Sequence, residues 1–381
     1  MNSNRHPLSS YDVTPEWLSE ALGASGVLGD SRVSAFDFEI IGQDRGFTGV
    51  VARLTPHYRS REPGAPDSLV AKFPLAERAG GASYREHVMS NPELARRFAE
   101  RAAREVHFYS AIGGVFSQRP ACYYGHADVG AGEVVLLLED LAGGVPGDAL
   151  AGCTVDEARS VLNGLAEFHA RGWGDHELLA MDWLGDWPAS ISGRADSYRQ
   201  QAAIVVERYR EQLRPEVLDL ISSLAESIQS TFDDLARAPA TLTHGDFHLD
   251  NVMFMPPADG PVAYIIDWQS VASGPALLDV GGFLAESLDI EDRRVHERRL
   301  LGEYHEGLAG GGVRGYPFER MYADYQRAIA VRFAGVVGWL SRVEIDDLEG
   351  RERALVEAIV DPGRVFVAML DHFGDGWNAA R

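Results

Sequence analysis

The chain has 381 residues, of which 45% are hydrophobic and 9% aromatic, and its formal net charge at pH 7 is −22. This length and composition are typical of a globular protein with a sizeable core. The acidic charge disfavours nucleic acids and anionic membranes as partners, because both bind to basic surfaces, and it is compatible with a cationic substrate.

The two cysteines, Cys122 and Cys153, lie far apart and form no Cys-x-x-Cys pattern. We therefore expect ordinary thiols rather than a disulfide framework or a zinc site. The N-terminus lacks the apolar stretch of a secretory signal, and no segment has the length of a membrane span, so we expect a cytoplasmic protein. The oligomeric state stays open.

The first third of the chain predicts a small antiparallel sheet. A short helix over residues 10–22 comes first, with Thr14 as its N-cap and Pro15 in its first turn. The first strand alternates apolar and polar residues, as a half-buried strand does. One main helix is expected over residues 92–112. Five strands are expected over residues 33–41, 50–57, 68–73, 122–126 and 133–138.

A turn-rich loop over residues 42–49 joins the first two predicted strands. Its backbone N–H groups could bind phosphates, and we expect Gly46, Thr48 and Gly49 to lie at such contacts. A plain hairpin loop is the alternative interpretation.

The chain holds a single lysine among its 35 lysine and arginine residues, and that lysine is Lys72 in the run SLVAKFP. A chain that uses arginine so consistently keeps a lysine where a compact ammonium differs in effect from a planar guanidinium. Lys72 ends an apolar strand and precedes a helix with candidate acidic partners. Kinases place their phosphate-binding lysine on such a strand. The alternative is that one remaining lysine lies there by chance.

The rest of the chain is predicted to be mainly helical. A helix over residues 155–173 begins with a capping-box pattern, Thr154 with Glu157 three residues later. One or two helices are expected over residues 197–236, and more over residues 289–375.

Residues 241–270 read TLTHGDFHLDNVMFMPPADGPVAYIIDWQS and carry the strongest chemical signal. Asn251 follows Asp246 after four intervening residues, and an apolar run over residues 262–266 ends in Asp267. This arrangement is typical of phosphoryl transfer. Asp246 would orient the attacking hydroxyl and accept its proton. Asn251 and Asp267 would supply hard oxygen ligands to Mg²⁺.

These motifs resemble those of the aminoglycoside phosphotransferase and choline kinase-like superfamily of small-molecule kinases. The segments that carry the resemblance are LTHGDFHLDNVMF and IIDWQSVASGPALLDVGGFL, with IIGQDRGFTGVVARLTPHY, SLVAKFP, ARRFAERAAREVHFYSAI, VVLLLEDL and LNGLAEFHARGW before them in the same order. They span roughly residues 35–290 and look most like the ecdysteroid-kinase-like branch. His-Gly-Asp and Asp-Trp-Gln replace the protein-kinase motifs, and no Ala-Pro-Glu follows, which favours a small-molecule substrate.

The resemblance implies an α+β, two-lobed, protein-kinase-like fold with a small antiparallel-sheet lobe and a larger, mainly helical lobe. It implies an N-terminal nucleotide-binding lobe over residues 1–138, a hinge over residues 139–144, and a catalytic and substrate-binding lobe over residues 145–381. Residues 197–236 would build the substrate cleft. Backbone groups at Glu139 and Leu141 would bind the adenine edge of ATP.

The resemblance also suggests roles for further side chains. Glu105 is the expected ion-pair partner of Lys72, with Glu100 as the second choice. His244 is expected to organise the catalytic loop, and Asp279 to brace it from below. His169 is expected to be structural.

The expected activity is ATP- and Mg²⁺-dependent phosphorylation of a hydroxyl group on a small molecule. The acceptor stays open between an aminoglycoside-like amino sugar, an amino alcohol, a sterol-like alcohol and another natural-product alcohol, because the acidic composition favours a cationic acceptor and the ecdysteroid-kinase-like motifs favour a hydrophobic alcohol. The choice of ATP or GTP stays open as well. Two alternatives come from other classes. One is a nucleotide-binding pseudokinase with a regulatory role, and the other is a metal-dependent hydrolase. The hydrolase would use the alternating residues His244, Asp246, His248 and Asp250 on one strand face, but it leaves Lys72 unexplained.

Overall fold

The computed structural model describes residue 7 and residues 12–42, 50–73, 91–256, 260–345, 348–361 and 363–374. The chain divides into two compact units. The first comprises Met1–Gly143 together with a pentapeptide from late in the chain, Ile266–Ser270. The second comprises Gly144–Ile265 and Val271–Arg381.

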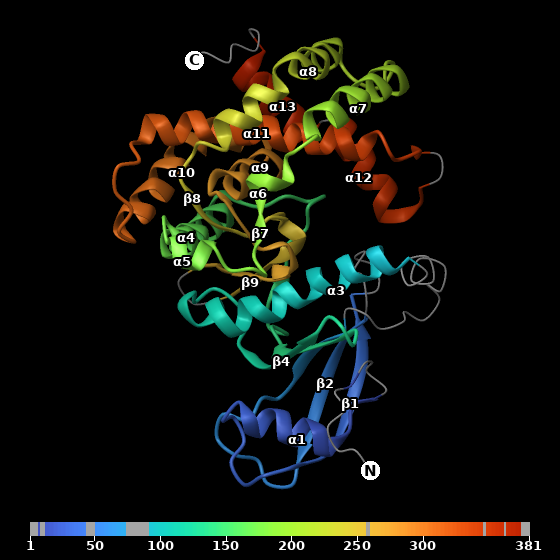
Figure 1. Ribbon diagram of the computed structural model, residues 1–381, viewed down its shortest axis with the longest axis vertical. Helices are drawn as coiled ribbons and strands as arrows, with labels where there is room; N and C mark the ends of the chain where they lie inside the picture. The colour runs from blue at the N-terminus through green and yellow to red at the C-terminus, as the bar shows by residue number, and fades with distance from the viewer. Residues whose placement is uncertain are drawn as a thin grey trace. The chain divides into compact units, whose positions relative to one another are not determined.

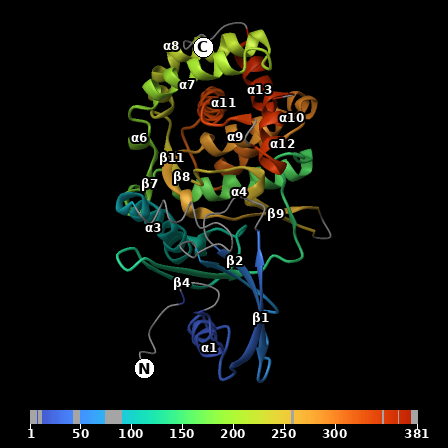
Figure 2. The ribbon, with the colours of Figure 1, turned by 90° about the vertical axis from the view of Figure 1, so that its right-hand side faces the viewer.

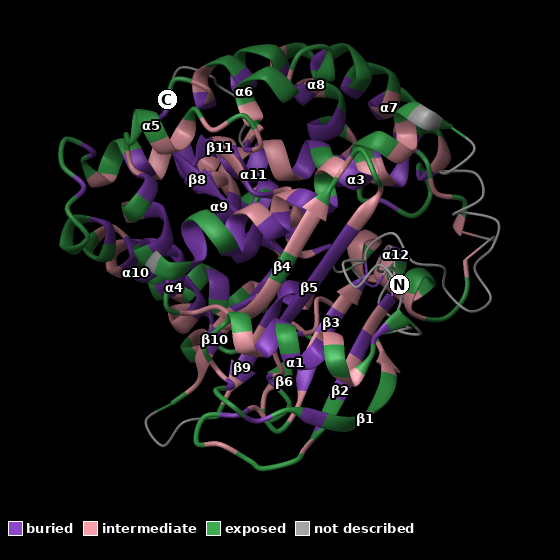
Figure 3. Cartoon of the chain, turned by 60° about the horizontal axis from the view of Figure 1, so that its bottom comes forward, coloured by how far each residue is buried: buried purple, intermediate pink, exposed green. Residues whose placement is uncertain are grey.

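Five antiparallel strands form the sheet of the first unit (Figure 1), and their order is β1-β2-β3-β5-β4, as the labels of Figure 3 show, so the predicted five-stranded sheet is confirmed. The predicted half-buried alternation of the first strand is confirmed in part, because Phe36 and Ile40 are partly buried against the core while Asp37 and Glu39 between them are exposed. β1 is an edge strand that pairs with β2 alone, and most of its residues are exposed, Phe38 among them (Figure 3). The strands are β1 Val33–Ile41, β2 Val50–Tyr58, β3 Leu69–Phe73, β4 Cys122–Asp128 and β5 Glu133–Glu139.

Two helices, α1 (Pro15–Ala24) and α3 (Pro92–His107), cover opposite faces of this sheet (Figure 2). Because successive side chains of a strand alternate between faces, Ala71 and its apolar neighbours on β3 join α1 in the core, while Lys72 points to the face that α3 covers. Thr14 caps α1 as predicted, accepting from the Trp17 N–H at 3.2 Å. The predicted 92–112 helix changes to a π-helical turn at Phe108–Ile112.

The second unit is mainly helical, as predicted, with two small three-stranded sheets, β10-β9-β6 and β7-β11-β8. Thr154 and Glu157 form the predicted capping box of α4. The helices are α4 Val155–Gly172, α5 His176–Leu179, α6 Trp187–Ser190, α7 Arg194–Arg208, α8 Pro215–Leu235, α9 Leu277–Ser287, α10 Ile290–Gly310, α11 Phe318–Leu340, α12 Gly350–Val360 and α13 Arg364–Phe373. The strands are β6 Val145–Pro146, β7 Gly185–Asp186, β8 Ala240–Thr243, β9 Val252–Met255, β10 Val262–Ile265 and β11 Ala272–Pro275.

Helix α11 lies at the centre of the second unit and packs against α7, α8, α9 and α13. Its approach to α9 depends on Gly281, since a Cβ at this position would lie 2.8 Å from the Cβ of Ala328. Such a contact is too short for two methyl groups, so glycine is required for this helix pair to pack so closely.

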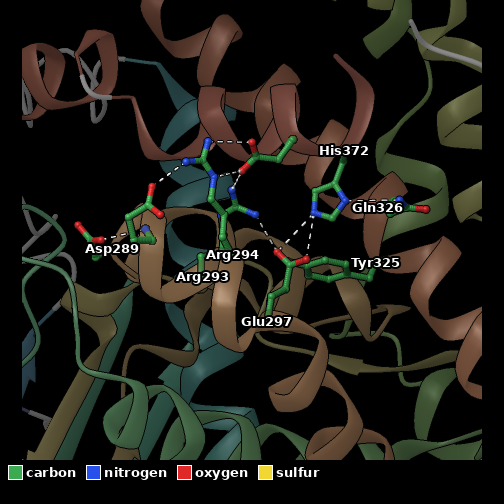
Figure 4. Close-up of polar contacts among 9 residues, drawn as sticks. Asp289, Arg293, Arg294, Glu297, Tyr325, Gln326 and His372 are labelled. Atoms are coloured by element: carbon green, nitrogen blue, oxygen red, sulfur yellow. Dashed lines mark hydrogen bonds and ion pairs between the residues drawn. The ribbon is translucent and has the colours of Figure 1, made fainter. Parts of the chain in front are cut away.

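A buried ionic network joins α10, α11 and α13 (Figure 4). Arg293 donates to Glu297 at 2.9 Å and also pairs with Asp371. Glu297 accepts a further hydrogen bond from Tyr325 at 2.8 Å and lies 3.2 Å from the ring nitrogen of His372. The Arg293 side chain is only 3% exposed, so its charge depends on these partners. The network thereby fixes the C-terminal half of α13 against α10.

Among the described residues, no helix combines the length and apolar character needed to cross a membrane.

Candidate active site

Lys72 forms a buried cluster with two carboxylates of the first unit. Its Nζ donates to both oxygens of Glu105, at 2.8 and 2.6 Å, and to Oδ1 of Asp267 at 3.2 Å. The predicted Lys72–Glu105 pair is therefore confirmed. The second choice, Glu100, instead pairs with Arg96 on the exposed side of α3.

The two carboxylates keep Lys72 charged. Burial alone would lower the pKa of Lys72, but the negative charges of Asp267 and Glu105 outweigh it and raise the pKa above its ordinary value. Glu105 is only 2% exposed, so an unpaired charge at this position would be costly. The cluster thus holds one fixed ammonium group inside the first unit.

Asp267 has an unusual backbone conformation. Its φ is 67°, and it is the one non-glycine residue with positive φ in the described part of the chain. Asp tolerates this region better than most residues, yet the conformation persists only where the surroundings impose it. The next residue, Trp268, is fully buried and stacks on Phe108 with ring centroids 4.0 Å apart. Gln269 donates to Oδ2 of Asp267 at 2.9 Å, so the carboxylate is held from both sides.

The segment expected to contact the nucleotide base begins at the end of β5. The Glu139 carboxylate accepts the Ala121 N–H at 2.9 Å, and Leu141 is buried. Asp140 accepts from Arg53 at 2.6 Å and from the Ser68 hydroxyl at 2.7 Å. These acidic side chains therefore brace the segment. Gly46, Thr48 and Gly49 of the expected phosphate loop lie outside the described residues.

The loop that carries Asp246 follows β8 and is held by Asp279 from below, as predicted. The Asp279 carboxylate accepts the N–H groups of His244 at 2.7 Å and of Gly245 at 3.2 Å. Gly245 has φ 81°, a conformation that glycine adopts without strain. His169 is fully buried and lies 3.2 Å from the same carboxylate, consistent with its expected structural role. His244 is also buried, with its ring edge-on to Phe247.

Asn251 is tied to the same loop. Its amide nitrogen donates to the main-chain oxygen of Asp246 at 2.9 Å and lies 3.2 Å from Nε2 of His248. Because an amide nitrogen can only donate, Nε2 of His248 is the acceptor, and burial lowers the pKa of His248 in the direction that favours the neutral ring. With the nitrogen committed, the Asn251 Oδ1 atom is the one that can serve as a metal ligand.

The strand face expected for the hydrolase alternative is not found. β8 ends at Thr243, and the residues that follow form a loop and a 3₁₀ turn rather than a strand. Asp250 accepts from the Arg351 guanidinium at 2.9 and 3.1 Å and from the Ala149 N–H at 3.0 Å. Its carboxylate is therefore engaged structurally. In the described segments, no three His, Cys, Asp or Glu side chains are grouped to hold a metal ion.

Asp246 lines a cavity of about 450 Å³ in the second unit. The sequence had placed the substrate cleft in residues 197–236, yet none of these residues is among those that line this cavity. The walls instead come from the 149–150 segment, the catalytic loop, α9 and the helices α11 to α13. The lining residues are Ala149, Leu150, Asp246, His248, Asp250, Glu286, Arg332, Gly335, Val336, Trp339, Leu355, Ala358, Ile359, Arg364 and Val365.

Sequence reasoning did not find the arginines at this cavity. Arg332 lines it, and Arg351 pairs with Asp250 in its wall. A chain in which nearly every basic residue is arginine offers no compositional signal for a special arginine. Only the spatial meeting of α11 and α12 with the catalytic loop distinguishes these two.

Comparison with known proteins gives a consistent assignment. A profile described as the phosphotransferase enzyme family matches residues 78–322. An uncharacterized kinase-like protein of Caenorhabditis elegans is 24% identical over 281 residues, which cover 66% of this chain and 68% of the relative.

Two solved structures show the same fold. Choline kinase from Cryptosporidium parvum aligns with a TM-score of 0.51 at 10% identity, over 89% of each chain. An aminoglycoside 2′-phosphotransferase, solved as a GDP complex, aligns with a TM-score of 0.52 at 12% identity, over 93% of this chain and 95% of the other. The predicted α+β, kinase-like fold and superfamily are therefore confirmed.

Proposed function

The chain belongs to the phosphotransferase enzyme family, and we propose that it transfers the γ-phosphoryl group of ATP to a hydroxyl group of a small molecule, with Mg²⁺ as the metal. The nucleotide part of this proposal is supported by the similar aminoglycoside 2′-phosphotransferase, which was solved with GDP. The coarser activity, small-molecule phosphotransfer, follows from the family.

The observation that carries the proposal is the Lys72 cluster. A fixed ammonium between Glu105 and Asp267 has few structural reasons to exist, because replacing buried ion pairs by apolar residues is often neutral or stabilising. Phosphoryl transfer gives it a reason, since the reaction requires positive charge positioned at the phosphates. Lys72 lies just before the residues matched by the family profile. Its contacts are therefore evidence for the proposed activity that is independent of the profile match.

In this proposal Asp246 orients the acceptor hydroxyl and takes up its proton. The loop around it is suited to this work, because Asp279 fixes two of its N–H groups and Asn251 fixes its carbonyl oxygen. Asp246 also faces the cavity, from which a hydroxyl could approach. A positioned group of this kind contributes about 10²–10⁴-fold to the rate.

The proposed Mg²⁺ ligands are Asn251 and Asp267. Both offer hard oxygen atoms, which Mg²⁺ prefers, and both side chains are buried and held by neighbours. When bound, the ion would neutralise negative charge on the nucleotide phosphates. Glu139 and Leu141 are proposed to present backbone groups to the base.

The test is Asp246→Asn, which keeps the size of the side chain and removes its charge. We expect nucleotide affinity to stay within about twofold while turnover falls by at least about 10²-fold. Turnover would be followed as ADP or GDP release with a panel of hydroxyl compounds, and affinity by calorimetry. Near-normal turnover in the variant would show that Asp246 is not the base. Nucleotide binding with no transfer to any acceptor, in the parent protein, would favour the pseudokinase alternative.

A further inference from the structure

The cavity beside Asp246 is mostly apolar. Helices α11, α12 and α13 contribute most of the aliphatic and aromatic part of its wall, and its volume of about 450 Å³ lies in the range that holds a drug-sized molecule. The apolar side chains are Leu150, Val336, Trp339, Leu355, Ile359 and Val365. This wall would bind the body of a substrate by burying apolar surface.

The charged residues of the wall are matched against one another. Glu286 accepts from Arg332 at 2.7 Å, and Asp250 accepts from Arg351 at 2.9 Å. Arg351 also pairs with Asp148 at 2.8 Å. Apart from Asp246, which the reaction uses, each carboxylate that lines the cavity thus has an arginine partner.

Arg364 is the remaining cation of the wall, and its guanidinium is committed to the main chain. It donates to the carbonyl oxygens of Ala149 and Glu286 through one nitrogen and to those of Leu150 and Ala151 through another, at 3.1 to 3.3 Å. These contacts place it as a structural residue that holds the 149–151 segment against α13.

Such a wall is poorly suited to a cationic substrate. A polycationic amino sugar entering a partly buried site requires several carboxylates that lack a cation of their own. A quaternary ammonium group requires aromatic faces around it, and Trp339 is the one Trp, Tyr or Phe among the described residues that line the cavity. The charge of −22 therefore gives a misleading indication of the substrate.

We propose that this cavity takes an uncharged alcohol with a largely apolar body, and that Arg351 and Arg332 disfavour cationic acceptors by neutralising Asp250 and Glu286. This inference rests on the proposed phosphotransferase function. The acceptor oxygen would form the new bond to the γ-phosphorus as the bond from that phosphorus to the ADP oxygen breaks, and Asp246 would take up the hydroxyl proton and pass it to solvent.

The first experiment compares acceptors with the parent protein. Menthol, borneol and androsterone represent uncharged alcohols, whereas kanamycin and choline represent cationic ones. Each compound is assayed for phosphorylation with Mg²⁺ and either ATP or GTP, and separately for binding by calorimetry without nucleotide. We expect at least one uncharged alcohol to exceed both cations by about tenfold or more in kcat/KM and in affinity, the scale of one or two methylene groups in an apolar pocket.

The second experiment removes one neutralising cation. Arg351→Gln leaves Asp250 and Asp148 without their arginine partner. Affinity for kanamycin should therefore rise by about fivefold or more, which is a small gain for one nearby opposite charge. Arg353→Gln is the matched control, because Arg353 lies on the same helix and pairs only with exposed Glu357 among the described contacts. It should change kanamycin affinity by less than about twofold.

The third experiment adds a carboxylate to the wall. Ala358→Glu should weaken binding of the uncharged alcohol by about tenfold or more, since an ionised group would be partly desolvated there. Ala354→Glu, one turn earlier on α12 and outside the lining, should leave it within about twofold. Melting curves of all four variants show which of them are folded.

The outcomes separate the two proposals. A parent protein that prefers kanamycin or choline would overturn the proposed substrate class and leave phosphotransfer intact. An uncharged alcohol that binds but is never phosphorylated would support the substrate class and count against the proposed function. If no compound binds the parent protein, the Arg351→Gln variant decides the question. A gain of kanamycin binding supports the proposal that Arg351 neutralises Asp250. No gain in a folded variant overturns that proposal.

Discussion

At the scale of single residues, Lys72 shows how much one ammonium group is constrained. It contacts two carboxylates at once, and its side chain is 15% exposed. Arginine would keep the charge, but its planar fork is wider and directs its donors differently. The position therefore depends on the shape of the cation as well as on its sign.

Lys72→Arg should consequently lower kcat by about 10²-fold or more, the scale of a lost electrostatic contact at a transition state, and should lower stability by only about 1–3 kcal/mol. Steady-state kinetics and thermal melting would measure the two effects. Amine labelling offers a check, because the N-terminus is the only other amine in the chain. Mg·ATP should protect Lys72 in the parent protein. Two results together would contradict the assigned role. The Lys72→Arg variant would be active, and nucleotide would leave the labelling of Lys72 in the parent protein unchanged.

Asp267 combines a proposed metal-binding role with a strained backbone. Asp267→Asn suits a test, because Asn also tolerates positive φ while it lacks the charge that Mg²⁺ requires. The parent should bind ATP more tightly with Mg²⁺ than with EDTA, and the variant should lose most of that difference in calorimetry. Equal affinity with and without Mg²⁺ in the parent protein would count against Asp267 as a ligand and against the kinase assignment itself.

The sequence made the Lys72–Glu105 pair predictable, because a strand lysine and a helix glutamate occur in a recognisable motif. The positive φ of Asp267 was not predictable in this way. The next residue, Trp268, is buried and stacks on Phe108, which lies more than 150 residues earlier in the chain. Contacts of such long sequence separation leave no local pattern.

At the scale of elements, the network between α10 and α13 is the clearest case of ionic coupling. Burial alone would raise the pKa of Glu297, but contacts with His372 and Tyr325 and the charge of Arg293 outweigh it and lower the pKa below its ordinary value. A lowered carboxyl pKa stabilises the fold above the unfolded value of about 4.5 and loses this contribution as the pH falls through the folded value.

Glu297→Gln should therefore lower the free energy of unfolding at pH 7 by about 3 kcal/mol, because it leaves Arg293 with less compensation in a buried site. The difference from the parent protein should shrink below pH 4.5. Glu291→Gln on the same helix is the control, since its side chain is 76% exposed, and it should change stability by less than about 0.5 kcal/mol. Equal effects of the two changes in urea unfolding would refute the importance of the network.

The elements themselves were largely predictable, and their burial was less so. Alternation and turn residues located all five strands of the first sheet, and the capping box located the start of α4. The exposure of β1 follows from its position at the edge of the sheet. That position depends on the order of the strands in space, which the pattern of residues within β1 does not encode. The cavity beside Asp246 was not predictable for a similar reason, because α11 and α12 carry no motif and reach the catalytic loop only through packing.

At the scale of the whole molecule, the net charge of −22 acts on stability rather than on the proposed substrate. Like charges repel one another in the compact state. At 0.1 M salt, this repulsion is largely screened between exposed charges that lie more than about 10 Å apart. Exposed ion pairs are also screened, but each contributes little. We therefore expect the melting temperature to rise by about one degree, which corresponds to about 1 kcal/mol in stability for a chain of this length, between 0.02 and 0.3 M NaCl. Unchanged or falling values in differential scanning calorimetry would show that the ion pairs dominate.

The rarity of lysine also decides how the protein can be cut. A protease that cleaves after lysine has a single target bond, between Lys72 and Phe73. That bond lies in β3, the middle strand, which pairs with β2 on one side and β5 on the other. A protease requires an extended, unpaired segment, so it can act only after this sheet has opened. Cleavage would yield residues 1–72 and 73–381. Its rate would report how readily the first unit opens, because the second unit contains no lysine and therefore no cleavage site.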